Sequence, residues 1–158
     1  MNQENPRLGV VGAGSWGTAL AKLLADKGFA LDLWVFEPEV REQIEKDREN
    51  KVFLPGFTLP ELITPTNDIE CAVKDKDLVL LVVPSHCMRD MAGRMKHFIS
   101  PDTIVVTASK GIENVSHMVM SQILEEILDF LPQDHIAVLS GPSFAKEVAN
   151  KVPTVVAS

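Results

Sequence analysis

A glycine-rich stretch near the N-terminus has the spacing that brings a polypeptide backbone close to a phosphate. Gly12, Gly14 and Gly17 form the pattern GxGxxG, which follows the apolar run 8–11 and opens a helix-like segment. The first glycine allows a tight turn, the second lets the backbone approach a pyrophosphate, and the third lets helix and strand pack closely. Amides at the helix start, with the positive end of the helix dipole, would hold the anion. Strand, turn and helix in this order predict a dinucleotide site rather than an empty turn.

Two residues that could contact adenosine stand at the end of the next apolar run, 31–36, and directly after it. Glu37 lies about 20 residues beyond Gly17, where an acid accepts hydrogen bonds from the adenosine ribose and repels a 2′-phosphate. It could equally be a solvated charge at the start of a helix. Phe36 could stack on the adenine, or it could be the last core residue of a strand.

Candidates for the reacting end follow the later apolar runs. Pro84 and His86 come after residues 77–83, and His86 could act as an acid or base, although nothing in the sequence pairs with it. Lys110, beside Gly111, could bind phosphate or polarise a carbonyl oxygen that gains negative charge. The turn 140–145 could hold a phosphate or hydroxyl through its amides and Ser143, or Ser143 could only cap a helix.

The elements that must position these residues alternate between strand and helix. The runs 77–83, 103–108 and 136–139 lack polar alternation, which suits strands buried on both faces of a parallel sheet. Helices are predicted over 18–25, 39–49 and 118–131, the last with a buried stripe of Val119, Ile123, Ile127 and Leu131. A short strand is possible at 62–64. The pattern predicts an α/β, Rossmann-type, doubly wound and mostly parallel sheet with helices on both faces. Residues after the strands should then converge on one crevice at their carboxyl ends.

Composition narrows the classes of function. The 158 residues are 46% hydrophobic, enough for one dinucleotide-binding domain over 1–158, and the net charge of −7 argues against nucleic-acid binding. Two cysteines are too few for a disulfide framework, and no His, Cys and carboxylate residues have the spacing of a metal site. No signal peptide or apolar run of membrane-spanning length is present, so we expect a soluble, cytoplasmic protein. Residues 153–158 look like the start of another strand, which suggests the N-terminal domain of a longer protein.

Four motifs, in order and at suitable separations, resemble a known family. They are residues 12–21, 50–56, 109–113 and 140–145. Together they look like the N-terminal domain of NAD(P)-dependent glycerol-3-phosphate dehydrogenase. This family interconverts dihydroxyacetone phosphate and sn-glycerol 3-phosphate, which supplies the backbone for phospholipid synthesis. The resemblance implies an oxidoreductase with a small-molecule substrate.

The resemblance also implies roles for residues at matching positions. Ser15, Trp16 and Ala145 would contact the cofactor, Gly141 and Ser143 the substrate, and Lys110 both. The full predicted cofactor set is Gly12, Gly14, Ser15, Trp16, Gly17, Phe36, Glu37, Pro84, Lys110 and Ala145. The position of Phe36 often carries a basic residue in members that use NADPH, so NAD(H) is favoured here and NADP(H) is possible.

The family's proton-transferring lysine belongs to a helical C-terminal substrate domain, beyond residue 158. We therefore expect this chain to bind nucleotide without turnover, and expect a homodimer to form through that further domain. One alternative is another two-domain Rossmann dehydrogenase for a hydroxyacid or sugar acid, which would lack the motifs at 109–113 and 140–145. The other is a non-catalytic module that senses NAD(H).

Overall fold

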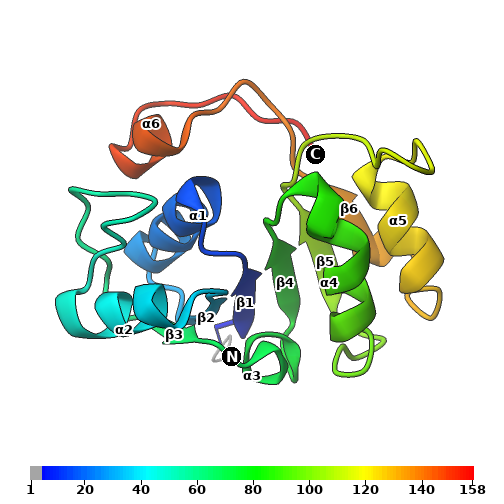
Figure 1. Ribbon diagram of the computed structural model, residues 1–158, viewed down its shortest axis with the longest axis horizontal. Coiled ribbons are helices and arrows are strands. Elements are labelled where there is room, and N and C mark those ends of the chain that lie inside the picture. Colours follow the sequence, from blue (N-terminus) through cyan, green and yellow to red (C-terminus); the bar gives the residue numbers. More distant parts are fainter. Residues whose placement is uncertain (1–4) are drawn as a thin grey trace.

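Among residues 5–158, which the computed structural model describes, six short strands form one all-parallel sheet (Figure 1). Their bounds are β1 Leu8–Val11, β2 Leu31–Trp34, β3 Ile63–Thr66, β4 Leu78–Leu81, β5 Ile104–Thr107 and β6 Ile136–Val138. The spatial order is β3-β2-β1-β4-β5-β6, so the direction of winding reverses between β1 and β4. This is the order of a doubly wound Rossmann sheet, and the predicted fold class is confirmed.

Helices cover both faces of this sheet. Their bounds are α1 Ser15–Asp26, α2 Pro38–Asp47, α3 Ile69–Val73, α4 Met88–Met95, α5 Met120–Ile127 and α6 Ala145–Ala149, with 3-10 turns at η1 Ser85–Cys87 and η2 Gln133–His135. α1 and α2 pack against one face, and α3, α4 and α5 against the other. Within residues 5–158, no helix is both long and apolar enough to cross a membrane.

The central strands are apolar without polar alternation because both of their faces are buried. On β1, Val10 belongs to the core under α1 and α2, whereas Val11 belongs to the core under α3, α4 and α5. Both are 0% exposed. Because successive strand residues point to opposite faces and both faces are covered, every position is apolar.

Two predictions, one about β6 and one about α5, are wrong in detail. β6 is an edge strand that pairs only with β5 among the described strands, so Val138 is 37% exposed rather than buried on both faces. The helix predicted over 118–131 covers only Met120–Ile127, and Val119 precedes it with 42% exposure. Of the predicted stripe, Ile123 and Leu131 are buried and Ile127 packs partly buried against the same core, so Val119 is the exposed member. A row of residues spaced by four drifts about 40° around a helix at each step, and Leu124 joins Ile123 in filling the core.

The last segment does not form the strand predicted at 153–158. From the end of β6 it crosses the carboxyl edge of the sheet, forms α6 over α1, and returns across the same edge (Figure 1). Its one described pairing is an isolated antiparallel bridge between Ser140 and Ala157. The segment therefore roofs the edge at which the predicted site residues lie.

Candidate functional site

Two of the three fingerprint glycines, Gly12 and Gly17, have the predicted structural roles in the tight turn and in the close packing of the helix. Gly12 has φ +113°, a left-handed backbone that glycine accepts readily, and an added Cβ would lie 2.2 Å from the Val82 carbonyl oxygen. A Cβ on Gly17 would lie 1.9 Å from the Gly12 carbonyl oxygen, so α1 can begin here only without a side chain. Gly14 differs, since its Cβ would meet nothing within 4 Å. The open surface at Gly14 is therefore free for a ligand.

The start of α1 is prepared for an anion. Gly14 is the N-cap and offers no side-chain cap, and the first turn holds no acidic residue. The first amides of a helix lack partners within it, and the dipole makes that end positive. A phosphate at this end would supply the missing acceptors.

Asn50 holds this glycine loop through hydrogen bonds. From the sequence it was identified only as part of the motif at 50–56. Its side chain is 0% exposed, and its amide donates to the Ala13 carbonyl oxygen at 2.8 Å and to Thr18 Oγ1 at 2.9 Å. Its Oδ1 accepts from the Phe53 amide at 3.0 Å. Thr18 Oγ1 also donates to Ala13 O at 3.1 Å. The glycine loop is thus fixed by buried hydrogen bonds from a segment more than 30 residues away.

A hollow of about 330 Å³, the Phe36 cavity, lies between the glycine loop, the end of β2 and the start of α4. The predicted residues that line it are Gly12, Gly14, Phe36, Glu37 and Pro84. Phe36 is 70% exposed, which makes the alternative of a core residue wrong. Its ring centroid lies 6.0 Å from that of the buried Trp34, so the side chain stands as an exposed ring on an apolar base. Glu37 is half-buried and is the N-cap of α2, a place that suits either of its predicted roles.

A second hollow of about 400 Å³, the Lys110 cavity, adjoins the first through shared residues at Gly14 and Pro84. From the fingerprint it is lined by Gly14, Ser15, Trp16 and Gly17. From the ends of the later strands it is lined by Pro84, Lys110, Ser143 and Ala145. The structure thus brings residues from three of the four motifs, together with the end of β4, to one edge of the sheet. His86 is exposed and lines neither cavity.

Lys110 is held at the mouth of this cavity. Ser109 Oγ accepts from the Val83 amide at 3.0 Å and joins the ends of β4 and β5. The exposed Lys110 then extends to the roof segment, where its Nζ donates to the Gly141 carbonyl oxygen at 2.8 Å. Gly111 has φ +127°, and a Cβ there would lie 3.0 Å from Ser85, so Ser85 rather than a ligand already accounts for this glycine.

The turn at residues 140–145 meets the cavity through only part of its length. Ser143 and Ala145 line the cavity, whereas Gly141 lies outside it and takes part through its carbonyl group. The N-cap of α6 is Phe144, without a side-chain cap, so the reading of Ser143 as a helix cap is wrong. An added Cβ on Gly141 would lie 2.6 Å from the Val155 carbonyl oxygen, which explains the glycine.

Comparison with known proteins agrees with this arrangement. The family model described as "NAD-dependent glycerol-3-phosphate dehydrogenase N-terminus" matches residues 7–158. The chain belongs to this family. It is 53% identical over 149 residues to glycerol-3-phosphate dehydrogenase [NAD(P)+] of Syntrophobacter fumaroxidans, covering 94% of this chain and 44% of that protein. The protein of the same name from Moorella thermoacetica is 48% identical over 150 residues, covering 94% and 43%.

Solved structures show the same relation. The crystal structure of glycerol-3-phosphate dehydrogenase from Coxiella burnetii matches with a TM-score of 0.88 and 34% identity, over 96% of this chain and 46% of that one. The chain therefore spans less than half the length of the relatives it matches.

In this member of the glycerol-3-phosphate dehydrogenase family, an ion-pair cluster fixes the loop that follows Lys110. Arg89 donates from Nε and Nη2 to the two carboxylate oxygens of Glu113, at 2.8 and 2.9 Å, and from Nη1 to Glu126 at 2.8 Å. The Arg89 guanidinium, followed by the Ser116 hydroxyl, lowers the pKa of Glu113 to about 2. Glu113 lies in the motif at 109–113, so the sequence pattern could have pointed to it. Its partner Arg89 lies in no motif, and no sequence pattern pointed to that residue.

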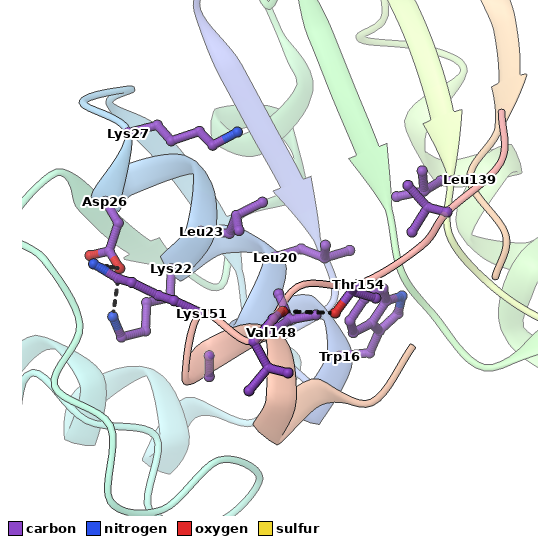
Figure 2. Close-up of a pocket in the computed structure, with 13 residues that line it drawn as sticks. Trp16, Leu20, Lys22, Leu23, Asp26, Lys27, Leu139, Val148, Lys151 and Thr154 are labelled. Carbon is purple, nitrogen blue, oxygen red and sulfur yellow. Dashed lines mark hydrogen bonds and ion pairs between the residues drawn. The ribbon is translucent and has the colours of Figure 1, made fainter. Parts of the chain in front are cut away.

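A hollow larger than either of these two cavities lies elsewhere in the described part of the chain. Figure 2 shows it between α1, α6 and the returning last segment, with a volume of about 590 Å³ and an apolar lining that includes Trp16, Leu20 and Val148. Three of its lining charges form one cluster, since Asp26 accepts from Lys22 at 2.8 Å and lies 3.5 Å from Lys151. None of its described lining residues is the N-cap of a helix, so size alone does not mark the site for a phosphate. No group of three or more metal-ligating side chains was found within residues 5–158.

Proposed function

We propose that this chain is the cofactor-binding domain of an NAD(P)-dependent glycerol-3-phosphate dehydrogenase. The observation that carries the proposal is the convergence of the glycine loop, Lys110 and Ser143 on one cavity that adjoins an apolar hollow at Phe36. Family membership and the names of the relatives support it.

The residues present fit a nicotinamide dinucleotide. The uncapped start of α1 and the open surface at Gly14 would receive the pyrophosphate, while Ser15 and Trp16 flank it. The exposed Phe36 ring would stack on the adenine, and Glu37 would accept hydrogen bonds from the ribose hydroxyls. Because a carboxylate repels a 2′-phosphate, NAD(H) is favoured and NADP(H) remains usable.

At the other end, Lys110 would serve the substrate. When bound, the cofactor supplies or accepts a hydride at the central carbon of a three-carbon phosphate. An ammonium group at the mouth of the cavity would stabilise the negative charge that develops on the carbonyl oxygen, or would bind the phosphate. The Ser143 hydroxyl and the neighbouring amides offer further donors to the same ligand.

The rest of the dehydrogenase lies outside this domain in our proposal. The relatives are more than twice as long as the matched region, and a helical domain in that remainder would supply the lysine that transfers the proton. Accordingly, the 158-residue chain would bind nucleotide without reducing dihydroxyacetone phosphate. We further propose a homodimer formed through that helical domain, acting in the cytoplasm.

The test is NADH oxidation, followed by absorbance, by the full-length protein that contains this domain. We expect oxidation with dihydroxyacetone phosphate and none with dihydroxyacetone, which lacks the phosphate. Lys110→Met should lower kcat/KM by about 100-fold, the usual effect of removing a donor to a developing oxyanion. The matched control is Lys46→Met, which removes an exposed ammonium on α2 and should leave the rate unchanged. Folded protein that binds NADH but oxidises it with neither ketone would favour the sensing module instead.

A further inference from the structure

Arg94 is a cation that the proposed function has not yet used. It lies on α4 with an exposed side chain, and its Cζ stands 5.4 Å from the centroid of the Trp34 ring. Within residues 5–158 no carboxylate pairs with it. Each of the other arginines does have a carboxylate partner, namely Arg7, Arg41, Arg48 and Arg89. An arginine that lacks such a partner has donors available for a ligand.

The guanidinium is also held in one place. A cation over the face of an indole is attracted by the ring, which favours a guanidinium lying against it. Trp34 is itself fixed, because it is 4% exposed and its Nε1 donates to the Asn67 carbonyl oxygen at 3.0 Å. The contact places the Arg94 guanidinium beside the fixed Trp34 ring, and within residues 5–158 its N–H groups donate to no carboxylate.

Arg94 lines the Phe36 cavity together with Phe36 and Glu37. The proposed dinucleotide places its adenosine in this cavity, with the ribose at Glu37. Asp90, one turn earlier on α4, lines it as well, so the cavity carries two carboxylates and a single guanidinium among its described residues. A dianionic group that enters here beside the ribose would be repelled by the carboxylates, and Arg94 is the one cationic side chain among the described lining residues that could offset this repulsion.

We propose, on the footing of the dinucleotide site above, that Arg94 is the residue that admits the 2′-phosphate of NADP(H). An arginine near the adenosine ribose is a known way to accommodate this phosphate, and the planar fork of N–H groups matches its oxygens. Glu37 and Arg94 then act in opposite directions. Glu37 favours the free 2′-hydroxyl, and Arg94 offsets the repulsion of the phosphate, so one site accepts both cofactors.

The experiment compares NADH and NADPH binding by isothermal titration calorimetry. The variants are Arg94→Gln, Arg94→Lys and Glu37→Gln, with Lys46→Gln as a control that removes one exposed positive charge elsewhere. The Arg94→Gln variant should bind NADPH about 10- to 100-fold more weakly than the unaltered protein, because it loses a charged hydrogen-bonded contact. NADH binding should change by less than about 3-fold, since it lacks the phosphate. Arg94→Lys should recover part of the loss, and Glu37→Gln should strengthen NADPH binding.

Several outcomes would overturn this inference. An equal loss for both cofactors would show that Arg94 contacts the shared part of the ligand, and no loss for either would show that it contacts neither. NADH binding without NADPH binding by the unaltered protein would also refute it while leaving the proposed function intact. Binding of neither cofactor would refute both. A circular-dichroism melt of each variant establishes that any loss is not unfolding.

Discussion

Substitution of the buried Asn50 tests whether hydrogen bonds from a distant segment hold the glycine loop in place. Asn50→Ala removes two donated hydrogen bonds, to Ala13 O and Thr18 Oγ1, and one accepted from the Phe53 amide. At about 1 kcal/mol for each net hydrogen bond, the free energy of unfolding should fall by about 3 kcal/mol. For a domain of this size, that corresponds to a decrease in Tm of about 6 to 12 °C.

Asn50→Asp is the sharper variant because it keeps the shape of the side chain. A carboxylate still accepts from the Phe53 amide, but it places an acceptor against the oxygens of Ala13 and Thr18 instead of a donor. Its cost should therefore equal or exceed that of the alanine variant, since an unpaired buried charge is more costly than a lost hydrogen bond.

The assay is urea unfolding with NADH titration on the same samples. Asn114→Ala, which alters an exposed asparagine, is the control and should change the free energy of unfolding by less than about 0.5 kcal/mol. NADH affinity should fall in both Asn50 variants, because the loop they loosen is the proposed pyrophosphate site. An Asn50→Ala protein as stable as the control would refute the reasoning, and so would unchanged NADH affinity in a destabilised protein.

Three further predictions concern the glycine loop and the ion-pair cluster. Gly17→Ala should lower stability by about 1–3 kcal/mol, because its Cβ would lie 1.9 Å from the Gly12 carbonyl oxygen. Gly14→Ala, with nothing within 4 Å of its Cβ, should keep its Tm and yet lose NADH binding; a calorimetric titration showing full affinity would refute the proposed approach of the ligand. Glu113 has a folded pKa of about 2, below its ordinary 4.5, so its contribution to stability is present above pH 4.5 and is lost as the pH falls toward 2. The Tm difference between the unaltered protein and Glu113→Gln should therefore shrink from pH 6 to pH 3, and a constant difference would contradict the pairing with Arg89.

The sequence predicts those parts of the fold that depend on local pattern. The fingerprint at Gly12, Gly14 and Gly17 marks the first strand, turn and helix, and uninterrupted apolar runs mark the central strands, because each strand contacts a core on both faces. The pattern could not show that Ile136–Val138 lies at the edge, since exposure there depends on which strand comes beside it. The limits of α5 were missed for a similar reason, as its buried face is chosen by the helix that packs on it.

The candidate site divides in the same way. Residues that follow strands were placed at the correct edge of the sheet, because parallel strands bring their carboxyl ends together. Asn50, Arg89 and Arg94 were not assigned roles, since each depends on partners far away in the sequence: Ala13, Glu113 and Trp34. Asn50 and Arg89 act through contacts within the protein, and Arg94 is positioned by such a contact, so no short motif marks any of the three.

The hydrogen bond between Lys110 and Gly141 bears on how quickly the site can accept a ligand. The partner of the ammonium is a neutral carbonyl oxygen on the roof segment, not a carboxylate. An incoming phosphate or alkoxide therefore competes with a dipole and does not have to separate an ion pair. Lys110 can exchange one acceptor for another without passing through a state in which its charge lacks a partner. The roof segment thus holds the lysine in position, and under the proposed function this neutral acceptor could be replaced by the substrate.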